Sequence, residues 1–361
     1  MPVSDFEMVQ AWDHVLTLSQ LERGQQVTIL TSAATHPQTL RTALIAAQMK
    51  GAVVNRLDLP PVNADKAHSR DALAYLGTTP LTGNRSAIAA LKASDLVLDL
   101  MTLLFSPEQH DILASGTKIL LAVEPPEILV RALPSLRDRD RVNAAAARIA
   151  AARMMHVTSA AGTDLHCPMG QFPAISEYGF VDKPGRWDHW PSGFALTFPD
   201  EGGARGTIVL DRGDILLPQK TYITEPIHIT VENGFATRIA GGMDADLLND
   251  YMAGFNDPEA FAISHIGWGL QSRSRWSTLA LYDREATIGM DARAFEGNFL
   301  FSLGPNNEAG GSRTTTCHID VPMRRCTVTL DGTAVVRRGV VVGEGEGEVA
   351  RRGAVVEEGE G

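Results

Sequence analysis

The stretch QQVTILTS, residues 25–32, opens the part of the chain that decides the fold. It is a short apolar run, and an Ala- and Leu-rich helical pattern follows it over residues 37–50. A short apolar run of this kind, bounded by turn signals, is typical of a buried strand. We therefore predict that residues 25–32 form a buried strand and that residues 37–50 form a helix.

The same alternation of strand and helix patterns continues through the first 155 residues. Further strands are predicted at AVVNRLDL (52–59), DLVLDL (95–100) and TKILLAV (117–123), and further helices at 86–94, 125–133 and 140–155. Strands that alternate with helices favour a parallel sheet with helices on both faces. Residues 1–155 are therefore predicted to be a doubly wound α/β domain. No GxGxxG motif follows the first strand, so a dinucleotide site is not supported.

The composition of the chain changes near residue 156, where Gly, Pro and aromatic residues become more frequent. Alternating segments at 206–216, 228–242 and 326–336 predict strands, with turns at Asn233-Gly234 and Asp331-Gly332. Residues 243–255 predict a single helix. We expect residues 156–342 to form a second domain of mixed α+β structure. Residues 343–361 are a low-complexity acidic tail, which we place outside the fold.

Charge, cysteine content and apolar run length exclude several classes of protein. The formal net charge is −11, which argues against binding to duplex nucleic acid. Three cysteines without a CxxC pair argue against a secreted disulfide scaffold and fit a reducing cytoplasm. The N-terminus has no apolar signal-peptide core, and Asp99 interrupts the longest apolar run, at 96–105. That run is too short to cross a bilayer, which takes about 20 apolar residues. We therefore predict a cytoplasmic protein with no nucleic-acid or membrane partner.

The segment TTTCHIDV (314–321) carries the first candidate metal ligands. Its β-branched residues predict a strand, and side chains two apart on a strand share a face. His318 and Asp320 are therefore predicted to point the same way and to be able to hold a divalent cation. Alternatively, the pair is a buried His–Asp hydrogen bond or part of an exposed polar face.

His265, in AISHIGWGL (262–270), is the third candidate ligand. The neighbouring glycines permit close backbone approach, so the imidazole is predicted to face a tight cavity. The alternative is a purely structural histidine. Two histidines and one carboxylate match the ligand set of mononuclear non-haem iron(II) oxygenases, which leaves coordination positions open. Zinc with a bound water is the competing interpretation of the same ligands.

The segment 167–193 has no clear periodicity but is rich in aromatic residues, and we expect it to fold over a site. Glu177 and His189 within it are candidates for an acid–base pair, the alternative being exposed loop side chains. Leu104 and Phe105 follow a predicted parallel strand, whose end faces the ligand crevice in such sheets, so they are candidate substrate contacts or ordinary core. Ser302, in FLFSLG (299–304), is a weaker candidate for contacting a ligand.

The other histidines separate into two groups. We expect those in helical or loop segments to face solvent: His14, His36, His68 and His110. Three others lie near strand segments and show no evident carboxylate partner in the sequence: His156, His166 and His228.

Three motifs carry a resemblance to a known family: SHIGWG (264–269), CHIDVPMRRC (317–326), and the loop containing SEYGF (176–180) and RWDHW (186–190). At these motifs, and from the N-terminus to about residue 340, the chain resembles the 2,5-dihydroxypyridine 5,6-dioxygenases of nicotinic acid degradation. The resemblance implies one Fe(II) per chain, held by His265, His318 and Asp320. It also implies that Glu177 and His189 act on the substrate.

The resemblance further implies that Leu104 and Phe105 lie beside the substrate ring. The implied substrates are 2,5-dihydroxypyridine and O2. Cleavage between C5 and C6, in the manner of an extradiol dioxygenase, would give N-formylmaleamic acid. The resemblance also implies a homo-oligomer, with a hexamer as the expected form.

The fold of that family is similar to that of thermophilic metallo-aminopeptidases with two metals, and GTDLHCPMG (162–170) resembles the peptidase pattern. At positions where those peptidases carry ligands, this chain has Phe194, His265 and Leu300, a difference that predicts a single metal. A metallo-aminopeptidase of the same fold is the first alternative. The second is a small-molecule binding protein whose His–Asp pair is structural.

Overall fold

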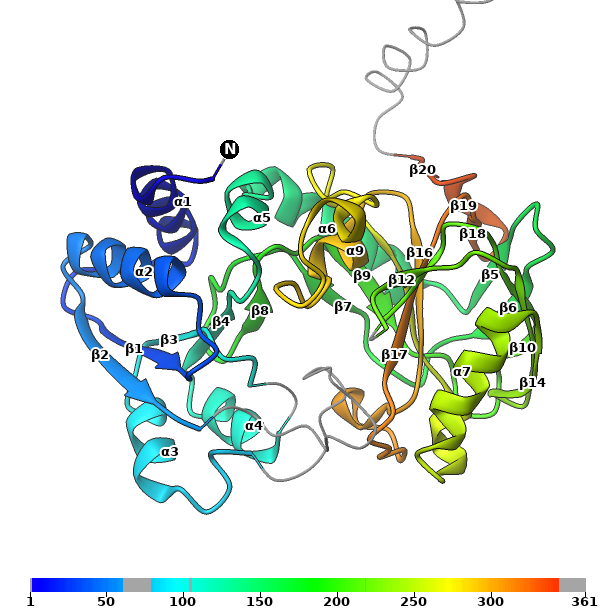
Figure 1. Cartoon of the computed structure of the whole chain (residues 1–361), viewed down its shortest axis with the longest axis horizontal. Coiled ribbons are helices and arrows are strands. Elements are labelled where there is room, and N and C mark those ends of the chain that lie inside the picture. Colours follow the sequence, from blue (N-terminus) through cyan, green and yellow to red (C-terminus); the bar gives the residue numbers. More distant parts are fainter. Residues whose placement is uncertain (1, 61–78, 104–105, 218, 344–361) are drawn as a thin grey trace, which may run out of the picture.

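A parallel five-stranded sheet, in the order β2-β1-β3-β4-β8, forms one end of the molecule (Figure 1). The computed structural model describes residues 2–60, 79–103, 106–217 and 219–343. The strands of this sheet are β1 (Gln26–Thr31), β2 (Val53–Asp58), β3 (Leu96–Asp99), β4 (Lys118–Leu121) and β8 (Trp187–His189). The four strands predicted from the first 155 residues are therefore confirmed, and all of them pair in parallel.

Four of the six helices in this part of the chain follow the predicted pattern, whereas the first and the fourth were not predicted. The six helices are α1 (Asp5–Leu18), α2 (Pro37–Met49), α3 (Arg85–Lys92), α4 (Pro107–Ala114), α5 (Pro126–Arg131) and α6 (Leu136–Ala151). The predicted bounds of the last helix, 140–155, were wrong at both ends. The Ser135 hydroxyl accepts a hydrogen bond from the backbone of Asp138 and so caps the helix earlier. Met154 and Met155 belong instead to the next strand.

An eight-stranded antiparallel sheet forms the opposite end of the molecule, in the order β14-β13-β10-β6-β5-β18-β19-β20 (Figure 1). Its strands are β5 (Met154–Thr158), β6 (Asp164–Pro168), β10 (Arg205–Leu210), β13 (Ile227–Glu232), β14 (Phe235–Gly241), β18 (Thr327–Leu330), β19 (Thr333–Arg337) and β20 (Val340–Val341). The predicted turns at Asn233-Gly234 and Asp331-Gly332 are confirmed, because all four residues have positive φ, as two-residue hairpin turns favour.

A second five-stranded sheet, in the order β17-β16-β15-β9-β7, lies between the other two (Figure 1). Its strands are β7 (Ile175–Glu177), β9 (Phe194–Thr197), β15 (Ile263–Gly269), β16 (Phe299–Leu303) and β17 (Ile319–Met323), and all of them pair antiparallel. The strand predicted at 314–321 was misplaced, because β17 begins only at Ile319. His318 therefore lies directly before the strand rather than within it.

The remaining elements are short connections and one longer helix. They are β11 (Ile215–Leu216), β12 (Thr221–Tyr222), α7 (Met243–Ala253), the 3-10 helix Pro258–Phe261, α8 (Thr278–Leu281), α9 (Met290–Ala294) and the 3-10 helix Asn307–Ala309. The helix predicted at 243–255 is thus confirmed. No helix among the described residues is long and apolar enough to cross a membrane.

The segment 167–193 joins the two five-stranded sheets. Its strand β7 pairs with β9 in the antiparallel sheet, and its strand β8 pairs with β4 at the edge of the parallel sheet. One apolar core accordingly contains Trp12 from α1 and Trp190 from this segment, whose ring centroids are 5.1 Å apart. The fold is thus a mixed α/β fold with one parallel and several antiparallel sheets, and a domain boundary at residue 155 stays a prediction.

Candidate metal centre

Strands β15 and β17 flank β16 and bring the three predicted ligands together. The Nε2 atom of His265 lies 2.8 Å from the Oδ1 atom of Asp320, and the Nε2 atom of His318 lies 3.3 Å from the same oxygen. One ligand atom from each residue lies within 4.8 Å of the other two, and all three residues are buried. Residues 265 and 318–320, far apart in the sequence, therefore meet at one point.

Two of these atoms lack well-aligned hydrogen-bond partners. His318 Nε2 and Asp320 Oδ1 are buried and make no well-aligned hydrogen bond with a described residue, although the ligand side chains lie within ion-pair distance of one another. A buried polar atom without a partner is costly, so such atoms in a folded protein usually interact with another group. Two imidazole nitrogens and a carboxylate oxygen suit a divalent transition metal. The residues present therefore fit a metal ion at this point.

Arg293, in α9, fixes the orientation of the Asp320 carboxylate. Its Nε atom donates to Asp320 Oδ2 over 2.5 Å, and its Nη1 atom donates to the carbonyl of Ile288 over 2.5 Å. The second carboxylate oxygen is thus occupied, and Oδ1 faces the two histidines. No pattern in the sequence around Arg293 pointed to this role.

The charges of the site shift the pKa values of Asp320 and His318. Burial alone would raise the pKa of Asp320, but the charges of Arg293 and His318 outweigh it and lower this pKa well below its usual range. Burial likewise opposes protonation of His318, but the charge of Asp320 and the contact with it raise the pKa of His318 to about 8. Asp320 is therefore ionised at neutral pH, and His318 holds a proton until a metal displaces it.

Glu177 and His189 form a second buried pair. They lie at the ends of β7 and β8, and His189 Nε2 is 2.8 Å from Glu177 Oε2. On the other side of the ring, Nδ1 lies 2.5 Å from the carbonyl oxygen of Pro191 and donates to it. Burial lowers the pKa of His189, but the hydrogen bond to Glu177 and its charge outweigh burial and raise it. The pair can therefore share a proton at Nε2.

Asp188 lies beside this pair, and the three side chains also present ligand atoms close enough for a metal. Its carboxylate, however, is already well satisfied. It accepts hydrogen bonds from the backbone of Tyr178, Gly179 and His189, and from Arg186 Nη2 over 2.6 Å. This arrangement favours a structural role for Asp188 over metal binding.

One cavity connects the ligand group and the acid–base pair. Its volume is about 910 Å³, including the part that is open to solvent. Its polar lining contains the two histidines and the carboxylate of the ligand group, the Glu177–His189 pair, Arg293 and Glu308. Its apolar lining comprises Leu113, Ile175, Trp187, Phe194, Leu196, Met290 and Leu300. A mostly apolar cavity with a few convergent polar groups is typical of a small-molecule site.

The remaining predicted site residues are placed as follows. Leu104 and Phe105 lie outside the described residues. Ser302 is buried and is not among the residues that line the cavity. Its hydroxyl accepts a hydrogen bond over 2.9 Å from the backbone N–H of His265, and it pairs with Asp320 across β16 and β17. Ser302 therefore contacts two ligand-bearing strands.

Several cavity residues were missed from the sequence. Glu308 follows a Pro-Asn-Asn turn that gave no signal, and burial raises its pKa although the charges of His318 and His265 oppose the rise. His110 was expected to face solvent; it is exposed and also lines the cavity. Only the position of α4, directly after the parallel strand β3, could have indicated that its side chains reach the site.

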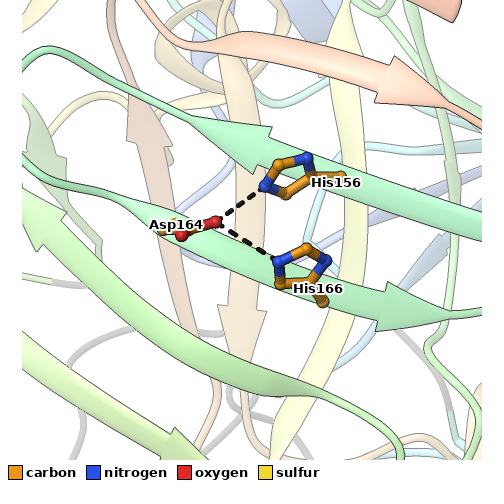
Figure 2. A group of neighbouring side chains, drawn as sticks. All are labelled: His156, Asp164 and His166. Carbon is orange, nitrogen blue, oxygen red and sulfur yellow. Dashed lines mark hydrogen bonds and ion pairs between the residues drawn. The ribbon is translucent and has the colours of Figure 1, made fainter. Parts of the chain in front are cut away.

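The prediction that His156 and His166 lack a carboxylate partner was wrong. Both imidazoles contact Asp164, with His156 Nε2 2.7 Å from Oδ1 (Figure 2). The pairing of β5 with β6 places the two histidines opposite each other, and Asp164 lies two residues before His166 on the same face. The alternation of Asp164 and His166 along a strand was the signal that could have revealed this group.

A mixed α/β fold with a buried His–His–Asp group beside an aromatic-walled cavity is typical of metal-dependent enzymes. Residues 7–343 match the family model described as 2,5-dihydroxypyridine 5,6-dioxygenase. The chain belongs to this family.

Known relatives agree with this assignment. A 2,5-dihydroxypyridine 5,6-dioxygenase of Pseudomonas putida is 54% identical over 342 residues, which cover 95% of this chain and 98% of that protein. A solved structure of the dioxygenase from Pseudomonas putida KT2440 has a TM-score of 0.92 at 54% identity and covers 94% of this chain and 98% of that chain. Wild-type AmpT from Thermus thermophilus is 15% identical, with a TM-score of 0.59 over 94% of this chain and 99% of that chain. The last similarity shows a common fold alone.

Proposed function

We propose that this chain opens the ring of 2,5-dihydroxypyridine between C5 and C6 with O2 and yields N-formylmaleamic acid. Family membership and 54% identity to a relative of that name support the reaction. The observation that carries the proposal is the convergence of His265, His318 and Asp320 on one buried point beside the Glu177–His189 pair. That arrangement combines a metal ligand set with a proton carrier in a single cavity.

Fe(II), one per chain, is the metal that we propose for the three ligands. Two neutral imidazoles and one carboxylate leave a ferrous ion with a net positive charge and with open coordination positions. A bound ferrous ion would relieve the spin barrier between O2 and a singlet aromatic ring, while the ring itself would supply the electrons for the reaction. Arg293 would hold Asp320 with one oxygen toward the metal, because the other oxygen accepts from the guanidinium.

The walls of the cavity would orient the substrate and exclude water. Trp187 and Phe194 both lie close to His189, with ring centroids 5.5 and 5.4 Å from the imidazole. Apolar walls lower the local dielectric and so strengthen the electrostatic interactions of the substrate with the pair and the ligands. Leu104 and Phe105 remain proposed contacts of the substrate ring, in keeping with the position of α4 directly after them. Ser302 is proposed to act through His265, whose backbone it holds.

His189 is the group that we assign to proton transfer. The hydroxyls of the substrate are para to each other, so it cannot chelate a metal as a catechol does, and loss of a hydroxyl proton would make the ring electron-rich. Nδ1 of His189 is engaged with Pro191, which leaves Nε2 as the atom that exchanges a proton. Glu177, 2.8 Å from Nε2, would stabilise the imidazolium that results.

The aminopeptidase alternative is not favoured by the lining of the cavity. Where two-metal peptidases of this fold carry further ligands, the chain has Phe194 and Leu300, and both line the cavity as apolar side chains. Neither can coordinate a cation, so a second metal would lack ligands there. A cytoplasmic location and a homo-oligomer are proposed from the family resemblance alone.

Oxygen uptake by the anaerobically iron-loaded protein tests the proposal. With 2,5-dihydroxypyridine, we expect uptake of one O2 per ring opened and incorporation of both atoms of labelled O2 into the product. His189→Ala should keep its iron but lose rate by about 10²–10⁴-fold, the usual contribution of a positioned acid–base group. His228→Ala, at an exposed histidine of β13, is the matched control and should keep the full rate. Silence of the iron-loaded wild type would favour a binding protein, and zinc-dependent peptide hydrolysis would favour a peptidase.

A further inference from the structure

A second group of metal-ligating side chains lies on the outer face of the eight-stranded sheet. His156 projects from β5, and Asp164 and His166 project from β6 (Figure 2). His156 pairs directly with His166 across the two antiparallel strands. The buried neighbours Met155, Val157 and Leu165 point to the opposite face, into the core. The three polar side chains therefore share one solvent-facing surface of a single hairpin.

The geometry directs all three donor atoms to one point. The imidazole rings of His156 and His166 are stacked, with centroids 4.1 Å apart and planes within 7° of parallel. Their Nε2 atoms lie 2.7 and 3.4 Å from the same oxygen, Oδ1 of Asp164. Donor atoms around a tetrahedral ion with bonds of about 2.0–2.1 Å lie roughly 3.3 Å from one another. The separation of 3.4 Å between Asp164 and His166 matches that value, whereas the 2.7 Å between Asp164 and His156 is shorter, so the two stacked rings must rotate to accommodate an ion.

We propose that His156, Asp164 and His166 form a second metal site, which binds a divalent transition-metal ion of the Zn²⁺ type. Imidazole nitrogens with one carboxylate oxygen suit zinc, copper and nickel better than calcium or magnesium. The side chains of His156, Asp164 and His166 are 33%, 66% and 39% exposed, so water can complete the coordination from the solvent side. The site lies in a different sheet from the central ligand group and is separate from the proposed reaction.

The opposing interpretation is a hydrogen-bonded triad without a metal. Asp164 would then accept from both imidazoles, as the dashed lines in Figure 2 mark. Arg205 lies opposite His166 on β10 and adds a positive charge that opposes cation binding. Arg205 is exposed, however, so salt and water screen its repulsion of a cation. Two imidazoles and a carboxylate in direct contact with the ion would outweigh that screened repulsion. The two interpretations differ in whether the group binds an ion at all, which can be measured.

Equilibrium dialysis of the metal-stripped full-length chain against Zn²⁺ alone tests the proposal. The double variant His156→Ala/His166→Ala should bind one Zn²⁺ fewer per chain than the wild type. His228→Ala, at an exposed histidine on the same sheet, should bind as many ions as the wild type. His318→Ala should lose the central ion and keep the surface ion, so the two sites are counted separately. Failure of the proposed ring-opening activity would leave these counts unchanged.

Asp164→Asn tests the proposal without a change in the size of the side chain. Asparagine keeps the size and a hydrogen-bonding oxygen of the side chain but removes its charge. Loss of a residue that hydrogen-bonds to a metal ligand typically weakens metal binding by about 10–100-fold. Loss of a charged residue that itself binds the metal should weaken the binding of Zn²⁺ at least as much. An Asp164→Asn chain that binds Zn²⁺ as tightly as the wild type, or a double histidine variant with an unchanged ion count, would overturn the proposal.

Discussion

At the scale of single residues, the two oxygens of Asp320 have different roles. Oδ2 accepts from Arg293, while Oδ1 faces His265 and His318 without a well-aligned hydrogen bond from any described residue. A carboxylate held in this way presents one oxygen to a metal in a fixed direction. The proposed ligand set therefore depends on a fourth residue that does not itself bind the metal.

Replacement of Arg293 tests this dependence. In Arg293→Met, Asp320 should lose its orientation, and the affinity for Fe(II) should fall by about 10–100-fold, as for other partners of metal ligands. Arg212→Met, at an exposed arginine, is the control and should leave the affinity unchanged. Anaerobic titration with Fe(II) measures both. Equal affinities of the two variants would show that Arg293 has no role in positioning the ligand.

The affinity for the metal should also depend on pH through His318. Its pKa in the metal-free protein is raised to about 8, so below that pH a metal must displace a proton from the imidazole. We expect the affinity for Fe(II) to fall by about tenfold per pH unit as the pH decreases from 8 to 7, and to level off above 8. Proton release measured during anaerobic titration at pH 7 should approach one per ion. An affinity that is constant between pH 7 and 8 would contradict the assignment.

At the scale of secondary structure, the sequence predicted some elements well and others poorly. Strands β1, β3 and β4 were predictable because each is a buried apolar run, whereas β2 is largely exposed. Strands β7 and β8 are three residues long, too short for any periodicity, although they carry Glu177 and His189. The spacing of His318 and Asp320 correctly predicted that they approach each other, although His318 lies just before β17 and not within it. Their meeting with His265 depends on the order of strands in the sheet, which no local pattern reveals.

The close packing of β15 against β9 is needed to place His265. A Cβ atom at Gly267 would clash with the carbonyl oxygen of Ala195 and with Leu196. We expect Gly267→Ala to destabilise the protein by about 1–3 kcal/mol, as overpacked cores do, and to lower the iron content because β15 must shift. Thermal unfolding and iron analysis would measure the two effects.

Gly202→Ala is the control for this substitution. Gly202 has a φ of +75° and open space around it, so alanine there is strained only by its backbone conformation. A cost of about 1–2 kcal/mol is expected from that strain, with full iron content. If Gly267→Ala also retained its full iron content, the placement of His265 would not depend on this packing.

At the scale of the whole molecule, the cavity lies where the parallel sheet meets the antiparallel five-stranded sheet. His189 comes from a strand of the first sheet, whereas His265 and Asp320 come from strands of the second. A site assembled from two sheets could not be predicted as a unit from the sequence. The family resemblance supplied the set of residues, and the strand order explains how they come together.

Removal of the metal should therefore lower the stability of the whole chain. An ion present at 100 times its dissociation constant stabilises the native state by about 2.7 kcal/mol. For a large domain, each kcal/mol corresponds to about 2 °C in Tm, so chelation should lower Tm by roughly 5 °C. His318→Ala should show a smaller shift, because only the surface ion is left to remove, whereas Asp164→Asn should keep the part of the shift that the central ion contributes. A shift of full size in His318→Ala would place the central ion elsewhere.

Anomalous X-ray scattering at the iron edge, from crystals loaded with Fe(II) under anaerobic conditions, tests the central claim most directly. One iron peak per chain is predicted in the cavity that the three proposed ligands line, within about 2.0–2.2 Å of nitrogens of His265 and His318 and of an oxygen of Asp320. A peak between Glu177 and His189 instead, or no peak beside Asp320, would contradict the proposed centre.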